Sequence, residues 1–220
     1  MSPRLEILHT DERIVVVAKP VGSVVVPGRG PDPEEPLSHA LGRELGSQVW
    51  VVHRLDREAS GVVLFARDAE AHRSLSLQFE RRETSKSYLV LVQGAVAAPG
   101  EVDRPLREFG SGRVAVDPRG KPALTRWRVL RRFPGATLLE VEPVTGRRHQ
   151  IRVHLYSIGH PVMGDTRYGE PRPVGGAPRL MLHAHTLAFV HPDGAPTTVR
   201  SEPGPDFEAV LRLLPGSARE

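Results

Sequence analysis

The sequence predicts an α+β fold in which helices and loops flank a mixed, mainly antiparallel sheet. Apolar segments with strand character outnumber those with helical periodicity. Several neighbouring strand segments lack between them the helical crossover that parallel pairing requires. No internal repeat and no long linker divides the 220 residues. We therefore expect residues 1–220 to form one domain.

The N-terminal strands are expected in two pairs. In LEILHTDERIVVVAKP, residues 5–20, two short strands surround a polar turn at Asp11 and Glu12. The second pair begins with VWVVHRLD, a strand that runs out into a loop, and continues with the apolar strand GVVLFA. The tetrad HRLD, residues 53–56, is therefore placed at a strand end.

Two helices are expected in the same half of the chain. The shorter covers residues 37–45 and the longer covers residues 69–82. In the longer one, Ala71, Leu75 and Phe79 recur every four positions. Residues at that spacing share a helical face, so this row should face the core.

The C-terminal half begins with a dense apolar strand over residues 86–94, which we expect to be buried on both faces. Residues 97–121 are rich in Gly, Pro and Arg and predict loops with a short hairpin. The further expected elements are strands near 125–130 and 137–141, a helix over 146–159, a strand over 179–190 and a helix over 206–214.

Composition excludes several classes of protein. The chain has no cysteine, which rules out disulfides, a thiolate nucleophile and sulfur ligands for zinc. It has no apolar run of membrane-spanning length and no secretion signal at its start, so we expect a cytoplasmic protein. Among 30 basic residues only Lys19, Lys86 and Lys121 are lysines. The permanently charged arginines fit an anionic partner, but a GC-rich genome explains them equally well.

The first candidate site is the loop VVHRLDREASG, where Asp56 lies between Arg54 and Arg57. A loop between two apolar strands can hold a side chain firmly while exposing it to a ligand. Flanking guanidinium groups would keep the carboxylate ionised and suited to act as a nucleophile or general base. The alternative is a structural ion pair, which is the commoner fate of an aspartate beside arginine.

The second candidate site is TGRRHQIRVHL. In a helix, Arg148 and Arg152 would share a face, while Ile151 and Leu155 would point elsewhere. With Arg147, and with Gly146 freeing backbone N–H groups, such a helix suits a phosphate or a buried arginine–carboxylate pair. A solvated basic face is the alternative.

Two further features have ordinary explanations. Tyr88 in Lys86-Ser87-Tyr88 is suited to stack on a ligand ring, although most strand tyrosines pack with one outward hydrogen bond. The histidines suggest a metal site, but no His-Glu-x-x-His or comparable spacing occurs, so we expect no metal. These histidines are His149, His154, His160, His183 and His185.

Five motifs in order resemble those of the RluA-like family of RNA pseudouridine synthases. They are HRLDREASG, KSYLVLVQG, TGRRHQIRVHL, GHPVMGDTRYG and RLMLHAH, and the resemblance runs from about Lys19 to Phe189. It implies the pseudouridine synthase catalytic fold, a curved antiparallel sheet with an RNA-binding cleft, as one catalytic domain. It also implies isomerisation of a uridine flipped out of structured RNA, a ribosomal or transfer RNA stem-loop.

The resemblance also implies a role for each site residue. Asp56 would be the essential nucleophile, Tyr88 would stack on the flipped base and relay its ring proton, and Arg152 would pair with Asp56. The remaining substrate-binding residues would be Arg54 and Arg148 toward the RNA, with Ile151 and Leu180 as the wall of the pocket. No redox change or group transfer occurs, so no cofactor or metal is expected, and the chain is expected to act as a monomer.

The sequence departs from the family pattern at two positions. Ala59 and Arg148 stand where threonine is usual; the first removes a loop hydrogen bond of about 1 kcal/mol and the second adds a phosphate contact. Many relatives also carry an N-terminal RNA-binding domain, whereas some eighteen residues precede Lys19. We therefore expect RNA to be recognised by the catalytic domain alone, through shape and a short single-stranded or loop sequence.

Two rival functions are considered. The first is an RNA-binding protein or RNA-folding chaperone that keeps the fold without catalysis, although binding alone has no need of Asp56, Tyr88 and Arg152 together. The second is a metal-dependent phosphodiesterase built on the histidines. RNA cleavage that a chelator abolishes would favour the second.

Overall fold

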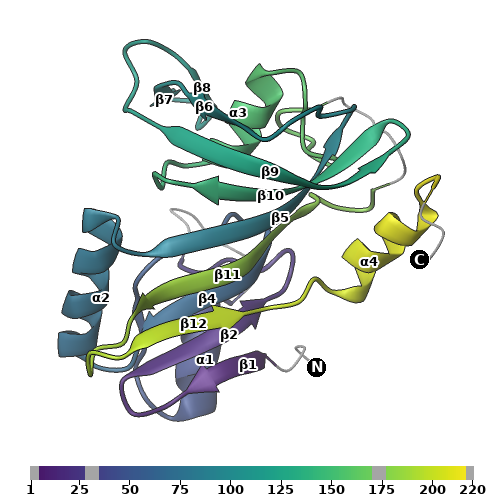
Figure 1. Ribbon diagram of the computed structural model, residues 1–220. Helices are drawn as coiled ribbons and strands as arrows, with labels where there is room; N and C mark the ends of the chain where they lie inside the picture. Colours follow the sequence, from purple (N-terminus) through teal and green to yellow (C-terminus); the bar gives the residue numbers. More distant parts are fainter. Residues whose placement is uncertain (1–4, 28–34, 170–176, 217–220) are drawn as a thin grey trace. The chain divides into compact units, whose positions relative to one another are not determined.

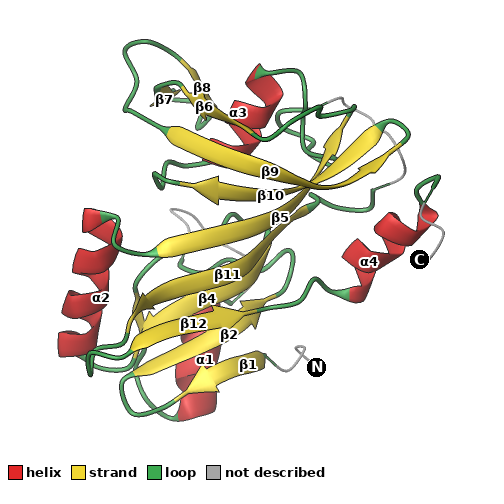
Figure 2. Ribbon diagram, in the orientation of Figure 1, coloured by secondary structure: helices red, strands yellow, loops and turns green. Residues whose placement is uncertain are grey.

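The computed structural model describes residues 5–27, 35–169 and 177–216, and the chain divides into two compact units (Figures 1 and 2). The first unit comprises Met1–Ser85 and Ala184–Glu202, and the second comprises Lys86–His183 and Pro203–Glu220. Each unit combines antiparallel strand pairs with helices, so the expected α+β class is confirmed.

The first unit is built on a sheet with strand order β1-β2-β4-β11, to which β3 and β12 add at β4 and β11, and the pairs β1–β2, β2–β4, β3–β4 and β11–β12 are antiparallel. The expected strand pair around Asp11 is confirmed. The expected helix over 37–45 is α1, and the second helix ends one residue before its expected end because Arg82 adopts a left-handed conformation. The elements of the first unit are β1 (Glu6–Thr10), β2 (Ile14–Lys19), α1 (Leu37–Leu45), β3 (Trp50–Val51), β4 (Ser60–Ala66), α2 (Ala69–Arg81), β11 (Leu182–Val190) and β12 (Pro196–Arg200).

One core cluster of the first unit lies between this sheet and α2, and the opposite face of β2 and β4 is also buried. Alternate residues of β2 and β4, such as Val16 and Leu64, are fully buried on one face. Ala71 and Leu75 of α2 pack into the same cluster and Phe79 borders it, as the four-residue spacing predicts. The loop that precedes β4 carries Asp56.

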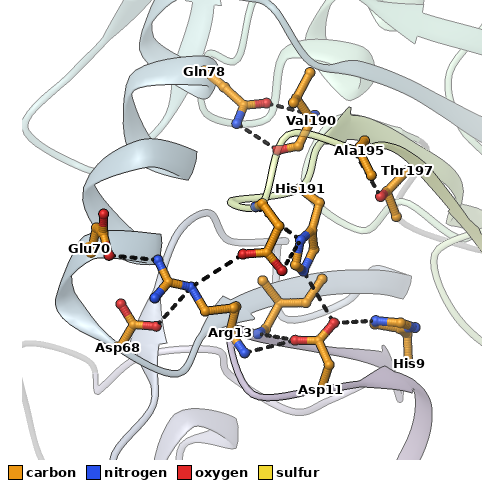
Figure 3. A network of polar contacts seen from close by, with 12 residues as sticks. His9, Asp11, Arg13, Asp68, Glu70, Gln78, Val190, His191, Ala195 and Thr197 are labelled. Carbon is orange, nitrogen blue, oxygen red and sulfur yellow. Dashed lines mark hydrogen bonds and ion pairs between the residues drawn. The ribbon is translucent and has the colours of Figure 1, made fainter.

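A polar network closes one end of the first unit (Figure 3). Asp11, in the turn between β1 and β2, accepts hydrogen bonds from the backbone N–H groups of Arg13 and Ile14 at 2.8 and 2.9 Å. Its carboxylate also lies 2.7 Å from Nε2 of His9 and 3.2 Å from Nε2 of His191. These contacts join the β1–β2 turn to the end of β11.

The second unit contains an antiparallel sheet with strand order β5-β10-β9-β6 and a separate hairpin of β7 and β8. The hairpin expected within residues 97–121 is confirmed, whereas β6 was not foreseen. The elements of the second unit are β5 (Ser85–Gln93), β6 (Gly100–Asp103), β7 (Leu106–Glu108), β8 (Val114–Val116), β9 (Leu124–Phe133), β10 (Ala136–Pro143), α3 (Gln150–Ser157) and α4 (Pro205–Leu213).

β5 differs from its expected burial. Only Val90, Leu91 and Val92 are buried, whereas Lys86 to Leu89 are partly exposed. The dense apolar run therefore marks a strand of which only the second half is enclosed. Tyr88 lies in the accessible half.

Candidate functional site

Asp56 lies in the loop between β3 and β4. Leu55 points inward with 6% of its surface exposed, while Arg54 and Arg57 are exposed and Asp56 is half-buried. The loop turns directly after the aspartate, because the backbone N–H of Ala59 donates to the carbonyl of Asp56 at 3.2 Å. The carboxylate is thus held near the surface on a short, hydrogen-bonded turn.

Hydrogen bonds from the end of β2 and the residues after it hold this turn in place. The carbonyl of Arg57 accepts hydrogen bonds from the backbone N–H of Gly22 at 2.9 Å and from Nζ of Lys19 at 3.1 Å. Lys19 is 1% exposed, and its Nζ also donates to the carbonyl of Pro20 at 2.9 Å. A buried ammonium on two carbonyls resists displacement, because losing either acceptor leaves a charge poorly solvated. Sequence reasoning gave Lys19 no such role.

Arg152 lies on α3 in the second unit and forms a buried ion pair with Asp165. Its Nε and Nη2 donate to the two carboxylate oxygens at 2.7 and 2.9 Å, and both side chains are at most 2% exposed. Burial would raise the pKa of Asp165, but hydrogen bonding and charge from Arg152, with the N–H groups of Arg167 and Tyr168, hold it below its usual value. The guanidinium plane is therefore fixed.

Tyr168 completes the support of Arg152. Its ring lies 5.3 Å from the guanidinium carbon, and its hydroxyl accepts from the N–H of Val114 at 3.0 Å and lies 2.7 Å from Nδ1 of His149. Asp165 and Tyr168 both come from the motif GDTRYG, to which sequence reasoning gave no residue roles. Their place in a family motif is the sequence signal that could have identified them.

The expected helix over 146–159 is wrong at its start. α3 begins at Gln150, and His149 before it has a φ of 53°, in the left-handed region. Gln150 sets this start, because its Oε1 accepts from the hydroxyl of Thr145 at 2.5 Å and from the N–H of Arg147 at 3.0 Å. The Arg147 N–H is thus used internally and is not offered to an anion.

The arginines of this segment consequently do not share a helical face. Arg147 donates to the carbonyl of Pro122 at 3.1 Å, and Arg148 forms an exposed ion pair with Glu108 of β7. Only Arg152 lies on the helix, and it is buried. The expectation that Arg148 and Arg152 share a helical face is therefore wrong, because the chain forms a turn before Gln150 and Arg148 lies outside the helix.

Tyr88 lies on the same face of its sheet as α3. It is opposite Val141 of β10, and Val141 is opposite Trp127 of β9. Residues directly opposite in an antiparallel pair, and residues two apart in one strand, share a face. Thr125 is therefore on that face too, and its hydroxyl oxygen lies 3.0 Å from Nε2 of Gln150 and 2.9 Å from Nδ1 of His154.

The remaining expected pocket residues are also in the second unit. Ile151 is 6% exposed on α3, and Leu180 is 2% exposed. The backbone N of Leu180 lies 3.2 Å from the position that a Cβ would occupy on Gly164, directly before Asp165. Within this unit the structure thus brings Leu180 to the Arg152–Asp165 segment, while Arg54 and Asp56 belong to the first unit.

Three of the histidines that suggested a metal site have polar partners within the fold. His154 lies between the hydroxyl of Thr125 and the carbonyl of Arg104, and burial holds its pKa below the ordinary value. Nδ1 of His160 and Nδ1 of His185 each lie 2.9 Å from a backbone carbonyl. Across residues 5–27, 35–169 and 177–216, no group of three potential ligands could hold a metal ion. In the same ranges, no helix has the length and apolarity needed to cross a bilayer.

Comparison with known proteins identifies relatives over most of the chain. Residues 13–157 match a family described as RNA pseudouridylate synthase. The chain is 38% identical to ribosomal large subunit pseudouridine synthase D of Nitrosomonas europaea, covering 97% of this chain and 67% of the relative. It is 41% and 40% identical to the dual-specificity RNA pseudouridine synthases RluA of Pasteurella multocida and Escherichia coli, each covering 87% of this chain and 89% of the relative.

Solved structures agree in fold. The human RNA pseudouridylate synthase domain containing 1 superposes with a TM-score of 0.78 at 27% identity, covering 96% of this chain and 90% of that one. The human RNA pseudouridylate synthase domain containing 4 gives a TM-score of 0.77 at 24% identity, covering 94% and 92%. The expected fold is thus confirmed by a second line of comparison.

Proposed function

This chain belongs to the RNA pseudouridylate synthase family and isomerises uridine to pseudouridine in RNA, and from that premise we propose that Asp56 is its nucleophile. One observation carries the assignment. The turn that bears Asp56 is fixed by a fully buried lysine, Lys19, while the Asp56 side chain stays half-exposed. A carboxylate that is held firmly and is still accessible is suited to attack a bound substrate.

The reaction itself explains why a carboxylate suffices. The bond from ribose C1′ to uracil N1 breaks, the base rotates, a bond forms from C1′ to C5, C5 loses its proton and N1 gains one. A carboxylate can add to the substrate and leave again, as this series of bond changes requires. Electrons and atoms balance within the substrate and solvent, so the reaction requires no cofactor or metal.

Arg152 is proposed to hold Asp56 ionised and correctly oriented. Asp165 engages Nε and Nη2, and we assign the third nitrogen, Nη1, to Asp56. The support is the rigidity of the guanidinium, which donates two hydrogen bonds to Asp165 and lies over the ring of Tyr168. A fixed donor loses little entropy when it binds a carboxylate.

Tyr88 is proposed to stack on the flipped uracil and to accept or relay the C5 proton through its hydroxyl. Its support is its place on the partly exposed half of β5, on the face that carries α3. Ile151 and Leu180 are proposed as apolar walls that keep water from the detached base. Arg54 and Arg148 are proposed to contact RNA phosphates, with phosphate displacing Glu108 from Arg148.

The substrate is proposed to be a stem-loop of ribosomal or transfer RNA. One relative is named for the large ribosomal subunit and two are named as dual-specificity enzymes. We further propose that residues 1–220 act as one monomeric catalytic domain in the cytoplasm. The family match, residues 13–157, crosses the unit boundary at Ser85, which supports a joint role for both units.

Incubation of the purified protein with ribosomal and transfer RNA labelled with tritium at uracil C5 tests the substrate proposal. Pseudouridine formation releases this label to water, and mapping then locates the modified uridine. We expect release from at least one RNA class, unchanged by a chelator. RNA binding without release would favour the silent RNA-binding protein, and chelator-sensitive strand cleavage would favour the phosphodiesterase.

A further inference from the structure

The side chain of His53, the first residue of the HRLD tetrad, makes a hydrogen bond to β4 at a position where β3 no longer pairs with that strand. β3 pairs with β4 through Trp50 and Val51 only, opposite Ala66 and Phe65. The chain then leaves the sheet, although the next residue of β4, Leu64, is fully buried. Nε2 of His53 accepts the backbone N–H of Leu64 at 3.0 Å. A side chain thus satisfies the buried N–H at the place where the Asp56 loop begins.

α2 holds the ring in the position that this bond requires. The imidazole of His53 stacks on Phe79 with centroids 4.7 Å apart and an interplanar angle of 15°. About two turns earlier on the same helix face, Nε2 of His72 lies 3.2 Å from the carbonyl of Val51. α2 therefore contacts both Val51, the last residue of β3, and His53 in the loop that follows.

The two histidines respond differently to a proton. Nε2 of His53 accepts from an N–H, so it must be unprotonated, and a protonated ring would place one donor against another. Nε2 of His72 faces a carbonyl and must carry a hydrogen, so protonation of that ring leaves its bond intact. Only the first contact is lost on acidification.

We propose that His53 is a positioning residue that, in its neutral form, holds the Asp56 loop on β4 and releases it when protonated. The inference rests on the proposed function, because it acts through Asp56. The charged or titratable groups on the surrounding elements are Glu70, His72, Arg73, Glu80 and Arg81 on α2, Lys19 at the end of β2, and Arg54, Asp56, Arg57 and Glu58 on the loop, while β4 carries none.

Three variants test the role in catalysis. His53→Gln places an amide oxygen near the position of Nε2 and does not titrate, whereas His53→Phe keeps a ring for stacking but has no acceptor. His72→Gln, which keeps a donor, is the matched control. We expect His53→Phe to lower kcat about tenfold or more with little change in KM, because a misplaced nucleophile still permits RNA binding. His53→Gln should recover most of kcat, and His72→Gln should resemble the wild type.

The pH profile separates positioning from simple packing. Wild type and His72→Gln should lose kcat between about pH 7 and pH 5.5, where histidine ordinarily titrates, and His53→Gln should be flatter over that range. An acid limb shared by wild type and His53→Gln would overturn the proposal. A wild-type kcat in His53→Phe would overturn it as well.

Hydrogen exchange at the Leu64 amide gives a readout that needs no activity. We expect exchange about tenfold faster in His53→Phe than in wild type or His53→Gln, and faster in wild type as the pH falls once the intrinsic pH dependence of exchange is removed. Equal protection in all variants would overturn the inference. If instead the Leu64 result holds while no variant, nor wild type, releases label from RNA, the function fails and the hydrogen bond stands.

Discussion

Arg152 pairs with buried Asp165 and is proposed to orient Asp56, so the effect of its replacement on stability must be separated from the effect on activity. Arg152→Ala would leave Asp165 buried and charged without its counter-ion, which typically costs about 3–5 kcal/mol of unfolding free energy. Loss of activity in that variant alone would therefore be ambiguous. Arg152→Lys keeps the charge but loses the two-nitrogen geometry.

We expect Arg152→Lys to remain folded and to lower kcat about tenfold or more, with RNA affinity nearly unchanged. Denaturant unfolding measures the first quantity, and single-turnover kinetics with a binding assay measure the others. A wild-type rate in a folded Arg152→Lys protein would remove Arg152 from the proposed site.

Tyr88→Phe separates stacking from proton transfer. The phenylalanine ring can still stack on uracil, so RNA affinity should hold, whereas loss of the hydroxyl should reduce kcat by about 10²-fold or more. Tyr156→Phe is the matched control, because Tyr156 is 47% exposed on the same unit. Normal turnover by Tyr88→Phe would exclude a role for the Tyr88 hydroxyl in proton transfer and leave the ring a packing role alone.

At the scale of elements, the β1–β2 turn should be sensitive to acid. Burial tends to raise the pKa of Asp11, but hydrogen bonds from His9 and two backbone N–H groups, with the charge of His191, lower it from 3.8 to about 2. A lowered carboxyl pKa stabilises the fold fully above pH 3.8 and ceases to do so as the pH falls through about 2.

Asp11→Asn keeps the acceptor for Arg13 and Ile14 but removes the charge beside the two histidines. We expect it to lower the free energy of unfolding at pH 7 by about 1 kcal/mol, with the difference from wild type vanishing toward pH 2. Glu12→Gln, in the same turn and exposed, is the control. A constant difference from pH 7 to pH 2 would contradict the assigned role of the Asp11 charge.

Elements were predictable where local sequence decides them. The four-residue spacing in α2 and the polar turn between β1 and β2 were sufficient. The start of α3 was not, because it depends on Gln150 binding Thr145 and on His149 meeting Tyr168, which lies 19 residues later. Helical periodicity carries no information about such contacts.

At the scale of the whole molecule, ordered motifs identified the family and local chemistry did not. Asp56 alone is indistinguishable in sequence from a structural ion-pair partner, and Arg152 alone from a surface cation. Lys19 was unpredictable as a buried support, because its acceptor at Arg57 lies 38 residues away. The pairing of Arg152 with Asp165 likewise depends on how α3 meets the following loop.

The account depends most on the carboxylate of Asp56. The decisive measurement is single-turnover tritium release from C5-labelled RNA by wild type, Asp56→Asn and the matched exposed control Glu58→Gln, with RNA affinity measured for each. We predict that Asp56→Asn binds RNA within a few-fold of wild type and releases no label, while Glu58→Gln behaves as wild type. Release by Asp56→Asn at a rate comparable to wild type would contradict the account.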